Sequence, residues 1–99
     1  MEDKVLFVIP AYNEELNIKK VIDEIKNLEI KSDIVVINDC SKDNTEKIVK
    51  ENGINCIRMP FNVGYSKAIQ TGLKYAVLED YDYVIQFVYQ CASRIIRFL

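Results

Sequence analysis

Four short, mainly apolar runs constrain the fold of this chain more than any other feature of its sequence. They are KVLFVIP at 4–10, DIVVIND at 33–39, INCIRM at 54–59 and YDYVIQFV at 81–88. Runs rich in β-branched residues with little polar alternation are typical of strands buried on both faces of a parallel sheet. Because longer segments with helical spacing separate these runs, strands and helices are predicted to alternate, which indicates an α/β fold.

The three segments between these runs have the features of helices. In the first, Asn13 is the predicted N-cap, and apolar residues then recur at three- and four-residue steps, at Ile18, Val21, Ile22, Ile25 and Leu28. In the second, Asp43 is the predicted N-cap and Gly53 the predicted end. The third is expected from Gly64 to about Glu79, with four apolar side chains turned inward, at Ile69, Leu73, Ala76 and Val77. The expected architecture is Rossmann-like, with three layers (α/β/α) around a mainly parallel sheet.

The composition excludes several classes of function. A chain of 99 residues is at most one small domain, and its net charge of −2 gives no basic field, so we expect no nucleic acid partner. There is no histidine, which excludes catalytic schemes that need an imidazole. Cys40, Cys56 and Cys91 are an odd, widely spaced set that indicates neither a zinc site nor a disulfide framework, and reduced thiols fit a cytoplasmic location. No apolar run approaches the roughly 20 residues of a membrane-spanning helix.

Ligands of parallel α/β sheets bind beyond the carboxyl ends of the strands, and three loops follow such ends. These are PAYNEE at 10–15, NDCSKDNT at 38–45 and PFNVGYSKA at 60–68. The first loop has no glycine-rich turn, and its two carboxylates would repel a phosphate. A nucleotide could still bind through its base and ribose, whose N–H and hydroxyl groups donate to carboxylates, and Asp39 is placed for that.

Several of these residues have an equally reasonable structural interpretation. Glu14 and Glu15 would complement the dipole at a helix N-terminus. Gly64, Ala68 and Gly72 lie at i, i+4 and i+8 and leave one helix face almost bare of side chains. Such a face suits close packing of the helix on the sheet as well as room for a nucleotide beside the helix start.

Three motifs, taken together in their order and spacing, are more specific than any one of them alone. VIPAYNEE, VVINDCSKDNT and NVGYSKAIQTGLKYA together resemble the start of family 2 glycosyltransferases with the GT-A fold, over residues 4 to about 87. The resemblance implies half of a GT-A domain, and a UDP- or GDP-sugar as donor. The narrower likeness is to enzymes that act on polyprenyl phosphates or build cell-surface polysaccharides.

The resemblance also assigns residues to a donor site. The positions that match the family's nucleotide-sugar-binding motifs are Pro10, Ala11, Tyr12, Glu14, Asp39, Ser41, Gly64 and Lys67. Among them, Asp39 matches the acid that contacts the base, and Gly64 matches the glycine-rich start of a helix near the donor. No catalytic residue is assigned, because the family's acceptor site and general base lie in a later half of the domain.

The sequence departs from the family after the fourth strand. There the family continues with an Asp-x-Asp-type motif, which holds the Mg²⁺ or Mn²⁺ that bridges the donor diphosphate. This chain continues with VYQCASRIIRFL and has no acid after Asp82, so no metal ligand is assigned. We therefore predict that 1–87 is the amino-terminal part of a glycosyltransferase domain, and that 88–99 is an atypical tail, truncated or frame-shifted.

Three expectations follow for the chain by itself. It should bind the donor without transferring the sugar; the alternative is a non-catalytic nucleotide-binding or interaction module. The segment YVIQFVY at 83–89 is uncharged and prone to β-structure, so self-association through an exposed sheet edge is expected. The intact parent could also act at the membrane, and SRIIRFL at 93–99 has an alternative interpretation as a short interfacial segment.

Overall fold

The computed structural model describes residues 3–87 and 94–97 of the chain. Its centre is a five-stranded sheet in the order β3-β2-β1-β4-β5. The strands are β1 (Val5–Ala11), β2 (Asp33–Asn38), β3 (Asn55–Arg58), β4 (Tyr83–Gln86) and β5 (Arg94–Arg97). The first four strands pair in parallel, whereas β5 pairs antiparallel with β4. The predicted α/β class with a mainly parallel sheet is therefore confirmed.

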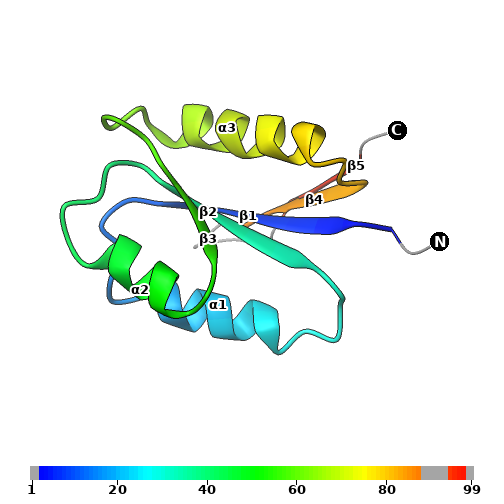
Figure 1. The fold of residues 1–99 in the computed structure, drawn as a ribbon, viewed down its shortest axis with the longest axis horizontal. Coiled ribbons are helices and arrows are strands. Elements are labelled where there is room, and N and C mark those ends of the chain that lie inside the picture. Colours follow the sequence, from blue (N-terminus) through cyan, green and yellow to red (C-terminus); the bar gives the residue numbers. More distant parts are fainter. Residues whose placement is uncertain (1–2, 88–93, 98–99) are drawn as a thin grey trace.

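Helices cover both faces of this sheet. They are α1 (Ile18–Lys26), α2 (Thr45–Glu51) and α3 (Tyr65–Leu78). Figure 1 shows α3 alone on one face, with α1 and α2 together on the other. Side chains of β1 alternate between the two resulting cores, since Leu6 and Val8 pack on the α3 side while Phe7 and Ile9 pack on the α1 and α2 side. A strand buried on both faces needs the continuous apolar run seen in the sequence.

A close approach between α3 and β1 depends on Gly72. A Cβ atom at this position would lie 2.4 Å from Cγ1 of Val8, which is far inside van der Waals contact. Ala68 and Gly72 are both buried in this interface. The packing interpretation of the small-residue helix face is thus correct for these two residues, while Gly64 stands at the N-cap, where a Cβ would meet open space.

Some predicted details of the helices are wrong. Helix α1 begins at Ile18, after a turn, and its N-cap position is held by Asn17 rather than by Asn13, whose φ is +52°. Leu28 lies beyond the end of α1 and is 47% exposed. Val77 is 59% exposed, because α3 touches the sheet only along the stripe that contains Ala76.

The side of the sheet formed by β4 and β5 also differs from the prediction. Strand β4 was expected to have an exposed edge, but β5 pairs with it along Tyr83–Gln86. Within residues 3–87 and 94–97, the outer strands of the sheet are therefore β3 and β5. The remaining predicted features of the tail, at 88–93 and 98–99, lie outside the described residues. None of the helices described is long and apolar enough to cross a lipid bilayer.

Candidate functional site

The three loops singled out in the sequence meet at one edge of the sheet. They follow the carboxyl ends of β1, β2 and β3 and occupy residues 12–17, 39–44 and 59–64. Since parallel strands all end at the same edge, these loops lie together on the left in Figure 1. All eight predicted donor-site residues lie in these loops, at the end of β1 or in the first turn of α3.

Hydrogen bonds from backbone to side chain join the first loop to the second. The backbone N–H of Asn13 donates to Oγ of Ser41, and the N–H of Lys42 donates back to Oδ1 of Asn13, both at 2.9 Å. The N–H of Glu14 donates to Oγ1 of Thr45 at 2.9 Å. This reciprocal pairing explains why Asn13 does not cap α1: its side chain bonds to the second loop.

A second pair of bonds continues the junction between the two loops. The N–H of Glu15 donates to Oδ2 of Asp43 at 3.2 Å, and the N–H of Asn44 donates to Oε2 of Glu15 at 3.4 Å. The other oxygen of Asp43 accepts the N–H of Thr45 at 3.0 Å and also its hydroxyl. The N-cap position of α2 is held by Asn44 rather than by the predicted Asp43, which lies one residue earlier, accepts the N–H of Thr45 and also holds the first loop.

The surroundings of Asp43 shift the pKa of its carboxyl group. Burial acts to raise the pKa of this carboxyl, but the hydrogen bonds from the hydroxyl and N–H of Thr45 and from the N–H of Glu15 favour the charged form, and the net effect lowers the pKa. The ionised carboxylate is consequently part of the folded loop structure at neutral pH.

Asp39 joins the second loop to the third. Its Oδ1 accepts the backbone N–H of Val63 at 2.7 Å, and its Oδ2 accepts the N–H of Gly64 at 3.0 Å. Its own N–H donates to the carbonyl of Ala11 at 2.8 Å, and the residue is only 5% exposed. The acid that directly follows β2 therefore has a structural role that the sequence alone did not reveal.

Asn38 is a polar residue of this site that the prediction missed. It is fully buried at the end of β2, and its Oδ1 accepts the N–H of Ser41 at 2.9 Å. Its Nδ2 has no hydrogen-bond partner among the described residues. The signal available in the sequence was an amide at the last position of a strand, directly after four apolar residues.

The predicted donor-site residues divide into a buried and an accessible set. Four of them are buried and form the framework: Pro10, Ala11, Asp39 and Ser41. The other four are partly or well exposed and face solvent at the loop edge: Tyr12, Glu14, Gly64 and Lys67. Close to the last set, Nε2 of Gln86 donates to the hydroxyl of Tyr65, which ties the start of α3 to the end of β4.

The described residues do not form a divalent metal site. No group of three or more Asp, Glu, Cys or His side chains in residues 3–87 and 94–97 is placed to hold an ion. The carboxylates near the loop edge, such as Asp39 and Asp43, instead accept backbone N–H groups. The donor set present here therefore does not fit Mg²⁺ or Mn²⁺, whose ligands are oxygens free to coordinate.

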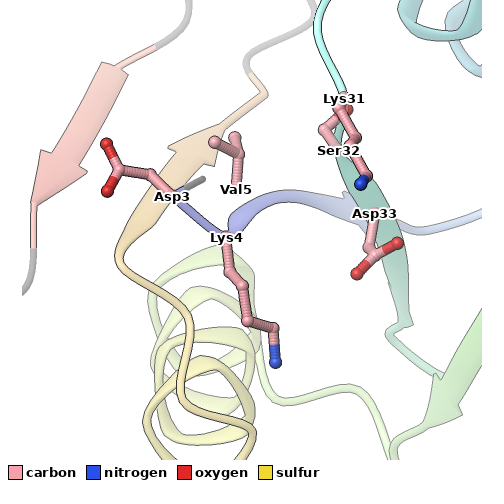
Figure 2. Close-up of a pocket in the computed structure, with 6 residues that line it drawn as sticks. All are labelled: Asp3, Lys4, Val5, Lys31, Ser32 and Asp33. Atoms are coloured by element: carbon pink, nitrogen blue, oxygen red, sulfur yellow. The ribbon is translucent and has the colours of Figure 1, made fainter. Parts of the chain in front are cut away.

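A depression of about 280 Å³ lies at the opposite edge of the sheet (Figure 2). Its lining comes from the segments that lead into β1 and β2: Asp3, Lys4, Val5, Lys31, Ser32 and Asp33. Two acidic and two basic side chains line it, and Nζ of Lys4 already donates to the carbonyl of Glu79 at 2.7 Å. Because this depression is at the amino edge, it is separate from the three loops.

Comparison with known proteins gives the same assignment as the motifs. Residues 6–87 match the family described as Glycosyl transferase family 2. An uncharacterized protein of Methanocaldococcus jannaschii is 43% identical over 88 residues, which are 82% of this chain and 38% of that protein. The UDP-N-acetylglucosamine–dolichyl-phosphate N-acetylglucosaminyltransferase of Methanococcus voltae is 48% identical over 52 residues, which are 52% of this chain and 20% of that enzyme.

A solved structure shares the fold. The mannosyltransferase of Pyrobaculum calidifontis, in complex with GDP-Man and Mn²⁺, superposes with a TM-score of 0.76 at 22% identity, over 86% of this chain and 27% of that chain. The present chain thus spans well under half the length of each of these relatives. The resemblance seen in the three motifs is confirmed, and the chain belongs to glycosyl transferase family 2.

Proposed function

We propose that this chain is the donor-binding part of an enzyme that transfers a sugar from a nucleoside-diphosphate sugar to an acceptor, in the synthesis of polyprenyl-phosphate sugars or cell-surface polysaccharide. The observation that carries the proposal is the junction of three loops at the carboxyl edge of the sheet. This is the edge where open α/β sheets bind ligands, and the eight residues with family-matching positions gather there.

The chemistry of the accessible residues fits a nucleoside diphosphate. Tyr12 is 46% exposed and offers a ring face on which a base can stack. Glu14 can accept a hydroxyl or N–H donor, and Lys67 brings a positive charge to the first turn of α3, suited to a phosphate. One relative is named for UDP-N-acetylglucosamine and one solved structure of similar fold contains GDP-Man, and the proposed donor is a UDP- or GDP-sugar.

We propose further that the chain binds this donor without transferring the sugar. The carboxylates of the described residues do not form a metal site. In the proposed division, residues 1–87 are the amino-terminal part of a glycosyltransferase domain and 88–99 an atypical tail. The proposed location is the cytoplasm, where nucleotide sugars are available, with action at the membrane reserved for an intact parent enzyme.

A second candidate is a non-catalytic nucleotide-binding module. The observation that favours it is the same lack of a metal site within residues 3–87 and 94–97. The two candidates share their expected results for the purified chain: sugar transfer from UDP- or GDP-sugars would contradict both, whereas donor binding without transfer agrees with both.

The test of donor binding is calorimetric titration of the chain with UDP and with GDP. Lys67→Ala is compared with Lys74→Ala, which removes another exposed lysine two turns further along α3. Loss of one charge-assisted contact to phosphate is expected to weaken binding about tenfold in Lys67→Ala, because such a contact is worth roughly 1.5 kcal/mol. Lys74→Ala should bind as the parent does. Absence of saturable binding of either nucleotide to the parent chain, or equal loss in both variants, would contradict the proposed site.

A further inference from the structure

Helix α3 ends in a turn whose N–H groups bond back to the last carbonyls of the helix. The N–H of Asp80 donates to the carbonyl of Val77 at 3.2 Å. The N–H of Tyr81 donates to the carbonyl of Ala76 at 3.0 Å. These two bonds form a Schellman motif, which places the residue after the C-cap in the left-handed region, and Asp80 has φ +59° there. Because glycine is the residue that adopts this conformation without strain, the turn is closed but is not strongly favoured by its own sequence.

The charges near this helix end oppose the helix dipole. The last turn of α3 contains no basic residue, and three acids follow the helix closely, at Glu79, Asp80 and Asp82. Negative charges near the carboxyl end of a helix are destabilising, because they lie at the negative pole of its dipole. A cation from another part of the chain would offset them.

Lys4, which comes just before β1, supplies that cation. Its Nζ donates to the carbonyl of the C-cap residue Glu79 at 2.7 Å and lies 4.6 Å from the centre of the Tyr81 ring. Figure 2 shows the side chain of Lys4 extending toward the ribbon of α3. Both contacts favour a charged ammonium, since a carbonyl at the end of a helix and the face of an aromatic ring each carry partial negative charge. Lys4 thus caps α3 across a sequence separation of 75 residues.

The backbone of Lys4 holds the strand that follows the turn. Its N–H donates to Oδ2 of Asp82 at 2.8 Å. Its carbonyl accepts the N–H of Asp82 at 2.8 Å and that of Tyr83 at 3.1 Å. Because β4 pairs with β1 over only four residue pairs, of which Val5 with Tyr83 is the first, these bonds extend a short ladder at its start. One residue therefore ties the end of α3 and the start of β4 to the start of β1.

We infer that Lys4 acts as a clasp on the connection between α3 and β4: its ammonium closes the end of the helix, and loss of that charge opens this turn while the sheet stays folded. The inference goes beyond the proposed function and does not depend on it. Figure 1 shows the end of α3 and the start of β1 on the side opposite the three loops of the candidate site. The expected effect is local, confined to the turn that follows Leu78.

The test is amide hydrogen exchange at the end of α3, measured by NMR in the parent chain and in Lys4→Met. Methionine keeps the unbranched stem of lysine and removes its charge and its donors. Exchange at Asp80 and Tyr81 is expected to be about three- to tenfold faster in Lys4→Met. The matched amides are those of Asn27 and Leu28, which bond to carbonyls at the end of α1 and should exchange as in the parent.

Two results in Lys4→Met would overturn the inference. One is unchanged exchange at the end of α3. The other is an equal increase at the end of α1, which would show a loss of stability throughout the chain rather than at one turn.

Two further variants test whether the charge of Lys4 is responsible. Lys4→Arg keeps the positive charge and should exchange close to the parent at the end of α3. Lys20→Met removes another exposed lysine, from α1, and should leave the same amides unchanged. Exchange as fast as that of Lys4→Met in either variant overturns the inference.

A second host serves if Lys4→Met alone does not fold. Asp80→Gly should slow exchange at Tyr81, corrected for the intrinsic rate of each sequence, because glycine adopts φ +59° without strain. Adding Lys4→Met to this host is again expected to speed exchange at Tyr81 about three- to tenfold, and an unchanged rate overturns the inference. Loss of the fold in both hosts also overturns it, since the opening is inferred to leave the sheet folded. No nucleotide enters these measurements, so they decide the role of Lys4 whether or not the chain binds UDP or GDP.

Discussion

Gly72→Ala should destabilise the chain even though alanine is the better helix former. Gly72 is buried in the middle of α3, where the replacement gains about 1 kcal/mol of helix propensity. Against this, the new Cβ would lie 2.4 Å from Cγ1 and 3.1 Å from Cγ2 of Val8. Val8 is 1% exposed on the central strand β1, so it has no free space into which to move. The overpacking is expected to cost about 2–3 kcal/mol.

The balance of these two effects is a net loss of about 1–2 kcal/mol in the free energy of unfolding. It can be measured by urea unfolding followed by far-ultraviolet circular dichroism, since the chain has no tryptophan. With a slope of about 1 kcal/mol per molar urea, the midpoint should fall by about 1–2 M. The propensity gain is measured separately by comparing Gln70→Gly with Gln70→Ala at an exposed position of the same helix.

A second test combines Gly72→Ala with a smaller side chain at Val8. Val8→Ala alone should cost about 2 kcal/mol through the loss of buried methyl groups. In the double variant the Cβ at position 72 takes the space that Cγ1 of Val8 leaves, so the double variant should be no less stable than Val8→Ala alone. Two results would refute this account of the interface: a Gly72→Ala variant as stable as the parent, or costs of Gly72→Ala and Val8→Ala that simply add.

Two titratable groups give the remaining predictions. Asp43→Asn should lower the free energy of unfolding by about 1 kcal/mol at neutral pH, because one of the two oxygens that accept backbone N–H groups becomes an N–H donor. Because the folded pKa of Asp43 lies below 3.8, its stabilisation is complete above about pH 4 and is lost as the pH falls through the folded value, so urea midpoints of parent and variant should converge in acid. Tyr81→Phe removes the 2.6 Å hydrogen bond from the Tyr81 hydroxyl to Oδ2 of Asp33 and should cost about 1–2 kcal/mol. Burial, and then this hydrogen bond, raise the pKa of Tyr81 above its usual 10.0, so its stabilisation is complete below about pH 10 and is lost above. In a spectrophotometric alkaline titration one of the six tyrosines should therefore ionise late, and Tyr81→Phe should remove that step; its persistence there would contradict the assignment.

The sheet was predictable because its determinants are local. Four mainly apolar runs gave the four parallel strands, each to within a few residues of its observed bounds. The fifth strand, Arg94–Arg97, was not predicted, because four residues with arginine at both ends carry no periodic signal. The prediction left β4 as an exposed edge strand, whereas in the structure β5 pairs with it. Because the sequence of β5 carries no strand signal, this pairing could not be predicted.

The errors in the helices come from long-range contacts. Asn13 is of a residue type that favours the N-cap position. Its side chain instead accepts the N–H of Lys42, 29 residues further along the chain. Val77 fits the helical period as well as Ala76 does, yet a single helix packed on a sheet buries only one stripe of its side chains. Spacing along the chain predicts which residues share a helix face, but only the packing partner decides which face is buried.

In the candidate site, too, the sequence did not predict the long-range contacts, and this affects how variants of the site are interpreted. Asp39, Ser41, Asp43 and Thr45 resemble ligand-binding side chains, yet each accepts backbone N–H groups from a neighbouring loop. Loss of nucleotide affinity in a variant of any of these four is therefore expected from displaced loops alone, and would not identify a contact. Groups outside this network are the informative ones, because removing Tyr12 or Lys67 breaks no hydrogen bond found between the loops. A comparison of Lys67→Ala with Lys74→Ala thus tests ligand contact, whereas variants of the junction test how the three loops hold one another in place.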